Sequence, residues 1–184
     1  MTVTQLSASG SAKGFTLVEA VITMAISGVV LAALMSVTVF VTRSFIAISN
    51  YRDLNQSSRF TLDMMGRDVR NAAGLTYYTT NNITLTNNDN TGFSYQWDPS
   101  SRALMRYYTN SDGTTAVNIM LTNCDVITFN IYQRNPTNNL TFVSAVSAPN
   151  QTKLINVDWK CSRTIMGAKA NTESVQTAQI VIRN

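Results

Sequence analysis

The chain has 184 residues and a formal net charge of +4, from 14 basic and 10 acidic side chains. Only 13% of the residues are charged, about half of the ~25% typical of soluble domains, whereas 45% are hydrophobic, enough for a core. The chain has no histidine, which excludes histidine-liganded metal sites, Ser-His-Asp and Cys-His catalysis and a histidine pH switch. Two cysteines are too few for a zinc site of four thiolates, and the scattered lysines and arginines form no cluster that would indicate nucleic-acid binding.

A long uncharged segment, Ala20 to Val41, dominates the N-terminal part of the chain. As an α-helix that rises about 1.5 Å per residue, it would be about 33 Å long, which matches the ~30 Å hydrocarbon core of a bilayer. Its serines, threonines and glycine are small and can hydrogen-bond back to the helix, so lipid tolerates them. The apolar part of a signal peptide has only ~7–15 residues and ends at a small-residue cleavage site. The sequence therefore predicts a membrane-spanning helix. One interpretation of this helix is a plain membrane anchor.

A motif precedes this segment. A short polar stretch ends in Lys13-Gly14, and residues 15–19 then read Phe-Thr-Leu-Val-Glu. Glu19 lies at the edge of the apolar run, where a carboxylate costs a few kcal/mol and therefore needs a partner. A polar leader that ends in glycine, this five-residue order and a long apolar helix together resemble the type IV prepilin family at every position of its signature.

The resemblance implies how the N-terminus is processed. Prepilin peptidase would cut between Gly14 and Phe15 on the cytoplasmic side, residues 1–14 would be the leader peptide, and Phe15 would be N-methylated. Glu19 would then be the fifth residue of the mature chain, where its carboxylate neutralises the N-terminal ammonium of a neighbouring subunit and sets the axial register. Two charges that are each costly in an apolar bundle become one pair. The alternative is that Glu19 only marks the membrane boundary.

We expect the helix to continue beyond the membrane, because no proline or glycine interrupts it between Val41 and Gly66. A charged row at i, i+4 and i+8 predicts a solvated face with weak ion pairs, and Gly74 is the expected C-terminal stop after a helix of about 88 Å that ends at Ala73. The charged row consists of Arg59, Asp63 and Arg67. The apolar stripe expected to face a core consists of Tyr51, Leu54, Ser58, Leu62, Met65, Val69 and Ala72.

After Gly74 the hydrophobic period changes from near 3.6 to near 2, and short β-prone segments alternate with Asn/Asp/Ser/Gly turns. No second helix is evident, so the sheet should be mostly antiparallel. The predicted fold is α+β: a membrane-spanning half-helix (15–41), an amphipathic half-helix (42–73) and an extracytoplasmic β domain (74–184) packed on the latter. The candidate strands are Ile83–Thr86, Gly92–Asp98, Ala103–Thr109, Asn118–Leu121, Val126–Arg134, Leu154–Ser162 and Gln176–Arg183.

The order of segments resembles one subgroup of the family, the minor pilins and pseudopilins of the PilW/GspJ kind. Residues 67–72 read Arg-Asp-Val-Arg-Asn-Ala at the helix end, residues 95–98 read Tyr-Gln-Trp-Asp, and residues 104–106 read Leu-Met-Arg. Residues 121–129 and the final Ile-Arg-Asn continue the likeness. Cys124 and Cys161 would lie outside the cytoplasm, where disulfides persist. A disulfide is favoured over two buried free thiols, and without Cys-x-x-Cys spacing a redox role is not expected.

Two other groups of residues could bind ligands, but turns and sheet packing explain them better. The stretches Asn87–Gly92 and Asn110–Gly113 offer oxygen ligands for Ca²⁺, but each has a single carboxylate and lacks the twelve-residue loop, so we interpret them as turns. Aromatic side chains near Arg102 and Arg106 could bind DNA bases or sugars, although sheet packing explains them better: Tyr77, Tyr78, Tyr107, Tyr108 and Trp159. No carboxylate pair or activated nucleophile stands out, so we expect neither an enzyme nor a cofactor or metal.

The leading hypothesis is a minor pilin that helps to assemble, and caps, a type IV pilus-like filament. Its partners would be prepilin peptidase, other major and minor pilins, the inner membrane and the assembly platform, with the N-terminus cytoplasmic and the β domain outside. Three alternatives remain open. The chain could be a subunit of the pseudopilus of type II secretion. It could also be a tip-located module that binds DNA or a surface, or a membrane-anchored protein that never polymerises.

Overall fold

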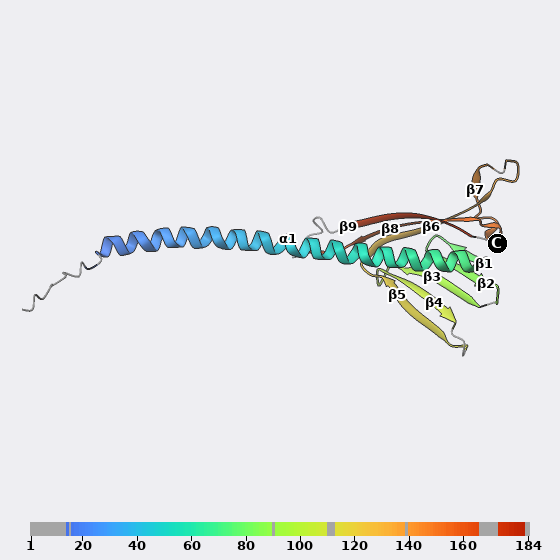
Figure 1. Cartoon of the computed structure of the whole chain (residues 1–184), viewed down its shortest axis with the longest axis horizontal. Helices are drawn as coiled ribbons and strands as arrows, with labels where there is room; N and C mark the ends of the chain where they lie inside the picture. Colours follow the sequence, from blue (N-terminus) through green and yellow to red (C-terminus); the bar gives the residue numbers. More distant parts are fainter. Residues whose placement is uncertain are drawn as a thin grey trace, which may run out of the picture. The chain divides into compact units, whose positions relative to one another are not determined.

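The computed structural model describes Gly14 and residues 16–89, 91–109, 113–138, 140–165 and 173–182. The chain divides into two compact units, Met1–Ser44 and Phe45–Asn184. A single helix, α1 (Leu17–Asn71), contributes its first part to one unit and its second part to the other (Figure 1). The fold is α+β, as the sequence predicts.

In the first unit, the side chains of α1 are almost all exposed. Several of its hydroxyl groups donate to carbonyl oxygens about one turn back in the same helix. Ser36 donates to the Ala32 carbonyl at 3.0 Å and Thr38 to the Leu34 carbonyl at 2.9 Å. These bonds satisfy the hydroxyl groups within the helix itself, which is what an apolar environment requires.

In the described residues of the second unit, nine strands form two antiparallel sheets. The first sheet is a meander whose strands follow one another in space as in sequence: β1 (Ala72–Thr79), β2 (Asn82–Asn87), β3 (Gly92–Asp98), β4 (Ala103–Thr109) and β5 (Thr115–Leu121). The second sheet has the order β7 (Phe142–Ser144), β6 (Cys124–Arg134), β8 (Leu154–Ser162) and β9 (Glu173–Val181), with a short 3-10 helix, η1 (Pro149–Gln151), before β8. Every strand pair in the described residues is antiparallel, which confirms that prediction.

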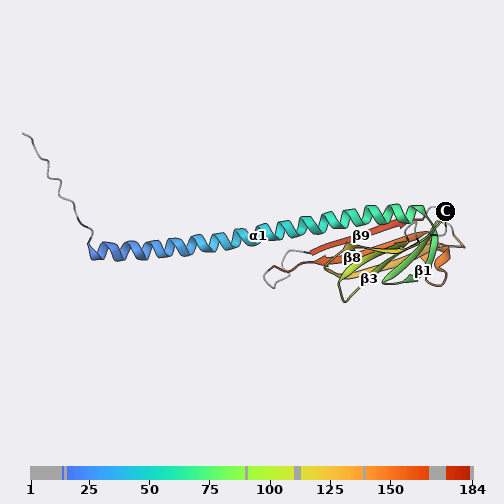
Figure 2. The same cartoon turned by 90° about the horizontal axis from the view of Figure 1, so that it is seen from below.

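The core of this unit lies between the second part of α1 and both sheets. The helix contributes Leu54, Met65 and Val69 as predicted, and Figure 2 shows it lying along β9. Tyr51 was expected on the same stripe but is 51% exposed, because the helix enters the core only from Leu54 onward. The buried helix face also includes Thr61 and Gly66, which the apolar pattern did not predict.

Polar contacts fix the position of the helix on the two sheets. The Trp159 indole N–H, fully buried on β8, donates to the Ser58 hydroxyl at 3.2 Å. The buried Thr61 hydroxyl lies 3.1 Å from the Met120 carbonyl oxygen on β5. Since β5 is the last strand of its sheet, this contact occupies a carbonyl on a sheet edge that would otherwise lack a strand partner. The helix therefore contacts both sheets through specific hydrogen bonds as well as apolar packing.

The end of the helix differs from the sequence prediction. The helix was expected to reach Ala73 and stop at Gly74, but it ends at Asn71 and β1 begins at the next residue. Gly74 lies inside β1, next to a register shift between Ala72 and Gly74. Gly74 therefore marks an irregularity in a strand and does not cap the helix.

Two other expectations are corrected. The structure contains two sheets rather than one, and the strands β1 and β7 were not predicted. The last strand was predicted for residues 176–183 and is found at Glu173–Val181, while Arg183 lies outside the described residues. The predicted bounds of β3, β4 and β8 agree with the structure.

Candidate functional site

The motif at the N-terminus forms the start of α1. The side-chain oxygen of Thr16 accepts a hydrogen bond from the backbone N–H of Glu19 at 3.3 Å. Because α1 begins at Leu17, Thr16 occupies the N-cap position, and Glu19, three residues on, completes the Thr-x-x-Glu pattern of a capping box. The motif therefore specifies where the helix starts, immediately after the predicted cleavage site at Gly14. Phe15 lies outside the described residues.

Glu19 lies in the first turn of α1, where a negative charge is favoured by the helix dipole. Its side chain is exposed, and among the described residues it forms no ion pair. The apolar residues that follow are exposed as well, for example Leu31 at 59% and Leu34 at 58%. The helix is long and apolar enough to cross a membrane, and no part of its most hydrophobic 18-residue stretch is buried. This part of the molecule is thus a surface that lipid or other apolar helices must cover.

A second polar cluster joins the end of the helix to the first sheet. Asp68 on α1 accepts hydrogen bonds of 2.6 Å from the Tyr95 hydroxyl on β3 and from Arg106 Nε on β4. The Asp68 and Arg106 side chains are only 16% and 15% exposed. The Arg106 guanidinium also lies over the rings of Phe93 and Tyr108, 5.8 and 4.6 Å from their centroids. Burial and the hydrogen bond to Asp68 raise the pKa of the Tyr95 hydroxyl well above its usual value of about 10.

This cluster comes from the segments on which the subgroup resemblance rests, residues 67–72, 95–98 and 104–106. Their contact was not predicted from the sequence. A usable signal was present, because Arg106 is two positions from the buried Leu104 and therefore faces the core. A charged residue at a core-facing strand position needs a buried partner of opposite charge, and Asp68 is that partner.

Cys124 and Cys161 occupy directly opposed positions on β6 and β8 and form a disulfide. Beside it, Arg102 Nη2 pairs with Asp125 Oδ1 at 2.5 Å, and the Ser162 hydroxyl donates to Asp125 Oδ2 at 2.5 Å. The disulfide and this polar group tie together the ends of β6 and β8 and the turn before β4. Their contacts give them a structural role.

The loops considered for Ca²⁺ are turns where the structure describes them. The Asp89 carboxylate accepts hydrogen bonds from the amide and hydroxyl of Thr91, at 2.9 and 2.6 Å. These bonds, first from the hydroxyl and then from the amide, lower the pKa of Asp89. Asn90 and residues 110–112 lie outside the described residues. No group of three or more potential metal ligands occurs in the part of the chain that the structure describes.

The aromatic residues considered for DNA or sugar binding do not form one site. Trp159 is buried under the helix, and the Tyr78 hydroxyl donates to the Phe129 carbonyl at 2.9 Å. Tyr108 lies beneath Arg106, on the core side of its sheet. Only Tyr77 and Tyr107 occupy the opposite, outer face of the first sheet.

The two arginines named with these aromatics are engaged elsewhere, Arg102 with Asp125 and Arg106 with Asp68. Arg106 also lies over the Tyr108 ring, but this contact is on the core side of the sheet and does not form an exposed surface of aromatic and basic side chains. This arrangement gives no support to a DNA-binding site there.

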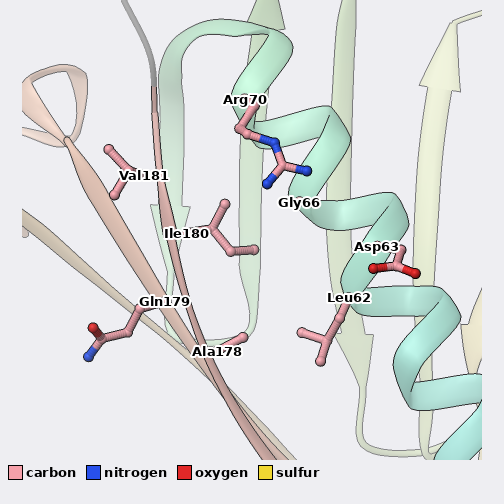
Figure 3. A pocket seen from close by; sticks show the side chains of 8 residues that line it. All are labelled: Leu62, Asp63, Gly66, Arg70, Ala178, Gln179, Ile180 and Val181. Atoms are coloured by element: carbon pink, nitrogen blue, oxygen red, sulfur yellow. The ribbon is translucent and has the colours of Figure 1, made fainter.

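A shallow groove of about 370 Å³ runs between α1 and β9 (Figure 3). Arg70 lies over Gly66, where an added Cβ would meet its guanidinium at 3.4 Å. The charged row predicted on this helix is exposed, but Arg67 donates to the backbone carbonyl of Asp63, at 3.4 Å. No ion pair joins its members in the described residues. The groove is lined by Leu62, Asp63, Gly66, Arg70, Ala178, Gln179, Ile180 and Val181.

Residues 10–35 match the family model described as the prokaryotic N-terminal methylation motif. The matched range contains Gly14, Phe15, Glu19 and the first part of the apolar helix, so the chain carries the leader of a type IV pilin-like precursor. A comparison with curated proteins finds no significant match. The motif and the exposed apolar helix together form the candidate functional site.

Proposed function

We propose that the chain is a minor pilin, a structural subunit that helps to assemble a type IV pilus-like filament and lies at its tip. Prepilin peptidase would remove residues 1–14 and methylate Phe15. The observation that carries this proposal is the methylation motif at residues 10–35, placed directly before an exposed helix able to cross a membrane. A plain anchor would need the apolar helix but not the motif.

Glu19 has a specific part in this proposal. After cleavage, the new N-terminal ammonium at Phe15 would lie four residues from the Glu19 carboxylate, within an apolar bundle. An unpaired charge there costs a few kcal/mol, and Glu19 forms no ion pair among the described residues. A neighbouring subunit that supplies the ammonium would satisfy both charges and fix the axial register of the two helices.

We further propose that the subunit is of the PilW/GspJ type and works by binding rather than by catalysis. The support is the contact between Asp68, Tyr95 and Arg106, which unites the sequence segments that resemble this subgroup. Pilus and type II secretion pseudopilus would use the same features, so the pseudopilin is the alternative assignment. In either machine the N-terminus would be cytoplasmic and the β domain outside.

The test of processing is the intact mass and N-terminal peptide of the protein taken from its native membrane. We expect a chain that begins at methylated Phe15. Gly14→Val should block cleavage, whereas Gly28→Ala should not; an added Cβ has no neighbour within 4 Å at either glycine, so neither change disturbs packing. A wild-type chain that retains residues 1–14 would overturn the proposal and leave a plain anchor.

The test of assembly uses Glu19→Gln, which keeps the shape of the side chain and removes its charge. We expect normal cleavage, normal membrane integration and loss from sheared filaments. Glu173→Gln is the matched control, because Glu173 pairs with Lys160 on the β domain at 3.0 Å. If Glu19→Gln enters filaments as well as wild type, the proposed role of Glu19 is wrong. Cross-linked partners of the wild-type protein would distinguish a pilus from a pseudopilus.

A further inference from the structure

The outer face of the first sheet carries two complete cross-strand rows of side chains. One row crosses all five strands through Tyr77, Thr84, Ser94, Tyr107 and Val117. The next row crosses them through Thr79, Asn82, Gln96, Met105 and Ile119. These positions alternate with the buried Ile83 and Tyr95 rows, so they face away from the core. The face is open, since Tyr77 is 52% and Ile119 63% exposed.

This face carries no basic residue, and its single carboxylate, Asp98, lies at the end of β3. Among the five strands, the charged residues are Arg106 and Asp98. Arg106 is on the core side, paired with Asp68. Asp98 ends β3 and accepts hydrogen bonds from Ser100 and Ser101 in the turn that follows. What remains is a surface of hydroxyls, amides, two tyrosines and a few apolar side chains. Nucleic acids bind chiefly through cations that contact phosphates, and these strands present none on this face.

A hollow of about 190 Å³ lies on the same sheet beside Tyr107. It is lined by Thr84, Gly92, Phe93, Ser94, Tyr107, Tyr108, Thr109 and Thr115. Glycine within a strand often marks a place where another molecule approaches the backbone closely. The hollow is smaller than the ~300–1,000 Å³ of sites that enclose a small molecule. It suits one unit of a polymer that lies across the strands.

We propose that this face binds a neutral polysaccharide. A sugar ring has an apolar C–H face that packs on an aromatic ring, and hydroxyls that hydrogen-bond with amide and hydroxyl side chains. Tyr77 and Tyr107 are three strands apart in one row, about 14 Å at ~4.8 Å per strand, with small hydroxyl residues between them. A neutral polymer would stack on both rings, seat one unit in the hollow above Gly92 and contact Gln96 beside it. This function does not depend on whether the chain is a pilin.

The test is retention of the full chain on insoluble polysaccharides. The protein is held in a polyoxyethylene detergent, because a sugar-based detergent would compete. The probes are cellulose, chitin and starch granules, with double-stranded DNA on beads as the charged comparison. We expect retention on at least one neutral polysaccharide, with less than a twofold change between 0.05 and 0.5 M NaCl, because no ion pairs are involved.

Two variants locate the site. Tyr77→Ala should lower retention about tenfold, whereas Tyr51→Ala is the matched control, with the same residue type at 51% exposure on the helix. Gly92→Val should fill the hollow and abolish retention; a Cβ there meets only the Leu85 carbonyl oxygen, at an ordinary 3.8 Å, so the fold should persist, as thermal unfolding can verify.

Several outcomes overturn the proposal. They are no retention on any of the three polysaccharides, retention that Tyr77→Ala and Gly92→Val leave unchanged, or binding to the DNA beads alone that salt abolishes. A fourth is a face that instead joins two copies of the chain, seen as a Tyr77-dependent dimer in detergent without polysaccharide binding.

Discussion

The two parts of α1 share one backbone but differ in what covers their side chains. Between Ala20 and Val41 the helix carries no charge and its side chains are almost all exposed, with Leu34 at 58% exposure. Beyond Phe45 it is apolar on one stripe, and that stripe is buried, with Leu54 at 3% exposure. Burying one leucine contributes about 1.5–3 kcal/mol. The β domain supplies this burial for the second part only, so the first part depends on lipid or on neighbouring helices.

The comparison implies that the first part of the helix determines membrane integration, whereas the second part contributes to the stability of the β domain. A change in the first part should affect integration and assembly without altering the unfolding of the domain. A change in the second part should do the reverse. Four predictions test this separation and the contacts that hold the second part of the helix on the β domain.

The same substitution in the two parts should have opposite consequences. Leu54→Arg places an unpaired charge in the core, which should destabilise the domain by about 3–5 kcal/mol, while leaving membrane integration intact. Leu34→Arg should weaken integration by about 2.5–3.5 kcal/mol, the cost of arginine at a helix centre, without lowering the thermal midpoint of the domain. Alkaline extraction of membranes and thermal circular dichroism measure the two properties. If either variant changed both properties equally, the separation would be wrong.

The disulfide should matter only to the second unit. Joining residues 37 positions apart restrains the unfolded chain by about 3–4 kcal/mol in the loop-entropy model. The double variant Cys124→Ala/Cys161→Ala should therefore lower the thermal midpoint by about 10 °C. Integration into the membrane should be unchanged, because neither cysteine is in the helix. An unaltered midpoint would mean that the disulfide does not stabilise the folded domain.

The same contrast explains how far the sequence predicts the structure. Periodicity and turn residues are local signals, so they locate α1 and give the bounds of β3, β4 and β8. They fail where the helix passes directly into β1 at Ala72, because no turn separates the two elements. They also fail for Tyr51, since a stripe predicts which helix face is apolar but not where along the helix the core begins.

The candidate site shows the same limit. The motif around Gly14 and Glu19 is contiguous in sequence, so it could be recognised directly. The cluster of Asp68, Tyr95 and Arg106 joins residues up to 38 positions apart, and its members meet only after the helix docks on the sheet. The outer tyrosine row likewise depends on strand register, because Tyr77 and Tyr107 face the same way only when β1 to β4 pair as they do.

Stability at high pH should depend on Tyr95, where the helix meets the first sheet. Its pKa is raised in the folded state, so above pH ~10 the unfolded chain loses a proton that the folded chain keeps. The stabilisation is complete below pH ~10 and declines above it, by up to about 1.4 kcal/mol per pH unit. Tyr95→Phe should flatten this decline, whereas Tyr77→Phe, on the outer face, should not. Urea unfolding between pH 9 and 11 measures both slopes, and parallel slopes for wild type and Tyr95→Phe would contradict the prediction.

The last prediction compares one residue type in the two parts of the helix. Ser58→Ala removes the acceptor of the buried Trp159 indole N–H, and a buried donor without a partner costs about 1–3 kcal/mol. Ser44→Ala removes a hydroxyl that donates only to the Phe40 carbonyl of its own helix, so the thermal midpoint should not fall. Both changes raise helix propensity equally, so the difference between the two midpoints isolates the contact with β8. If the midpoints agreed, the Ser58–Trp159 hydrogen bond would contribute nothing to stability, and α1 would be held against β8 by apolar packing alone.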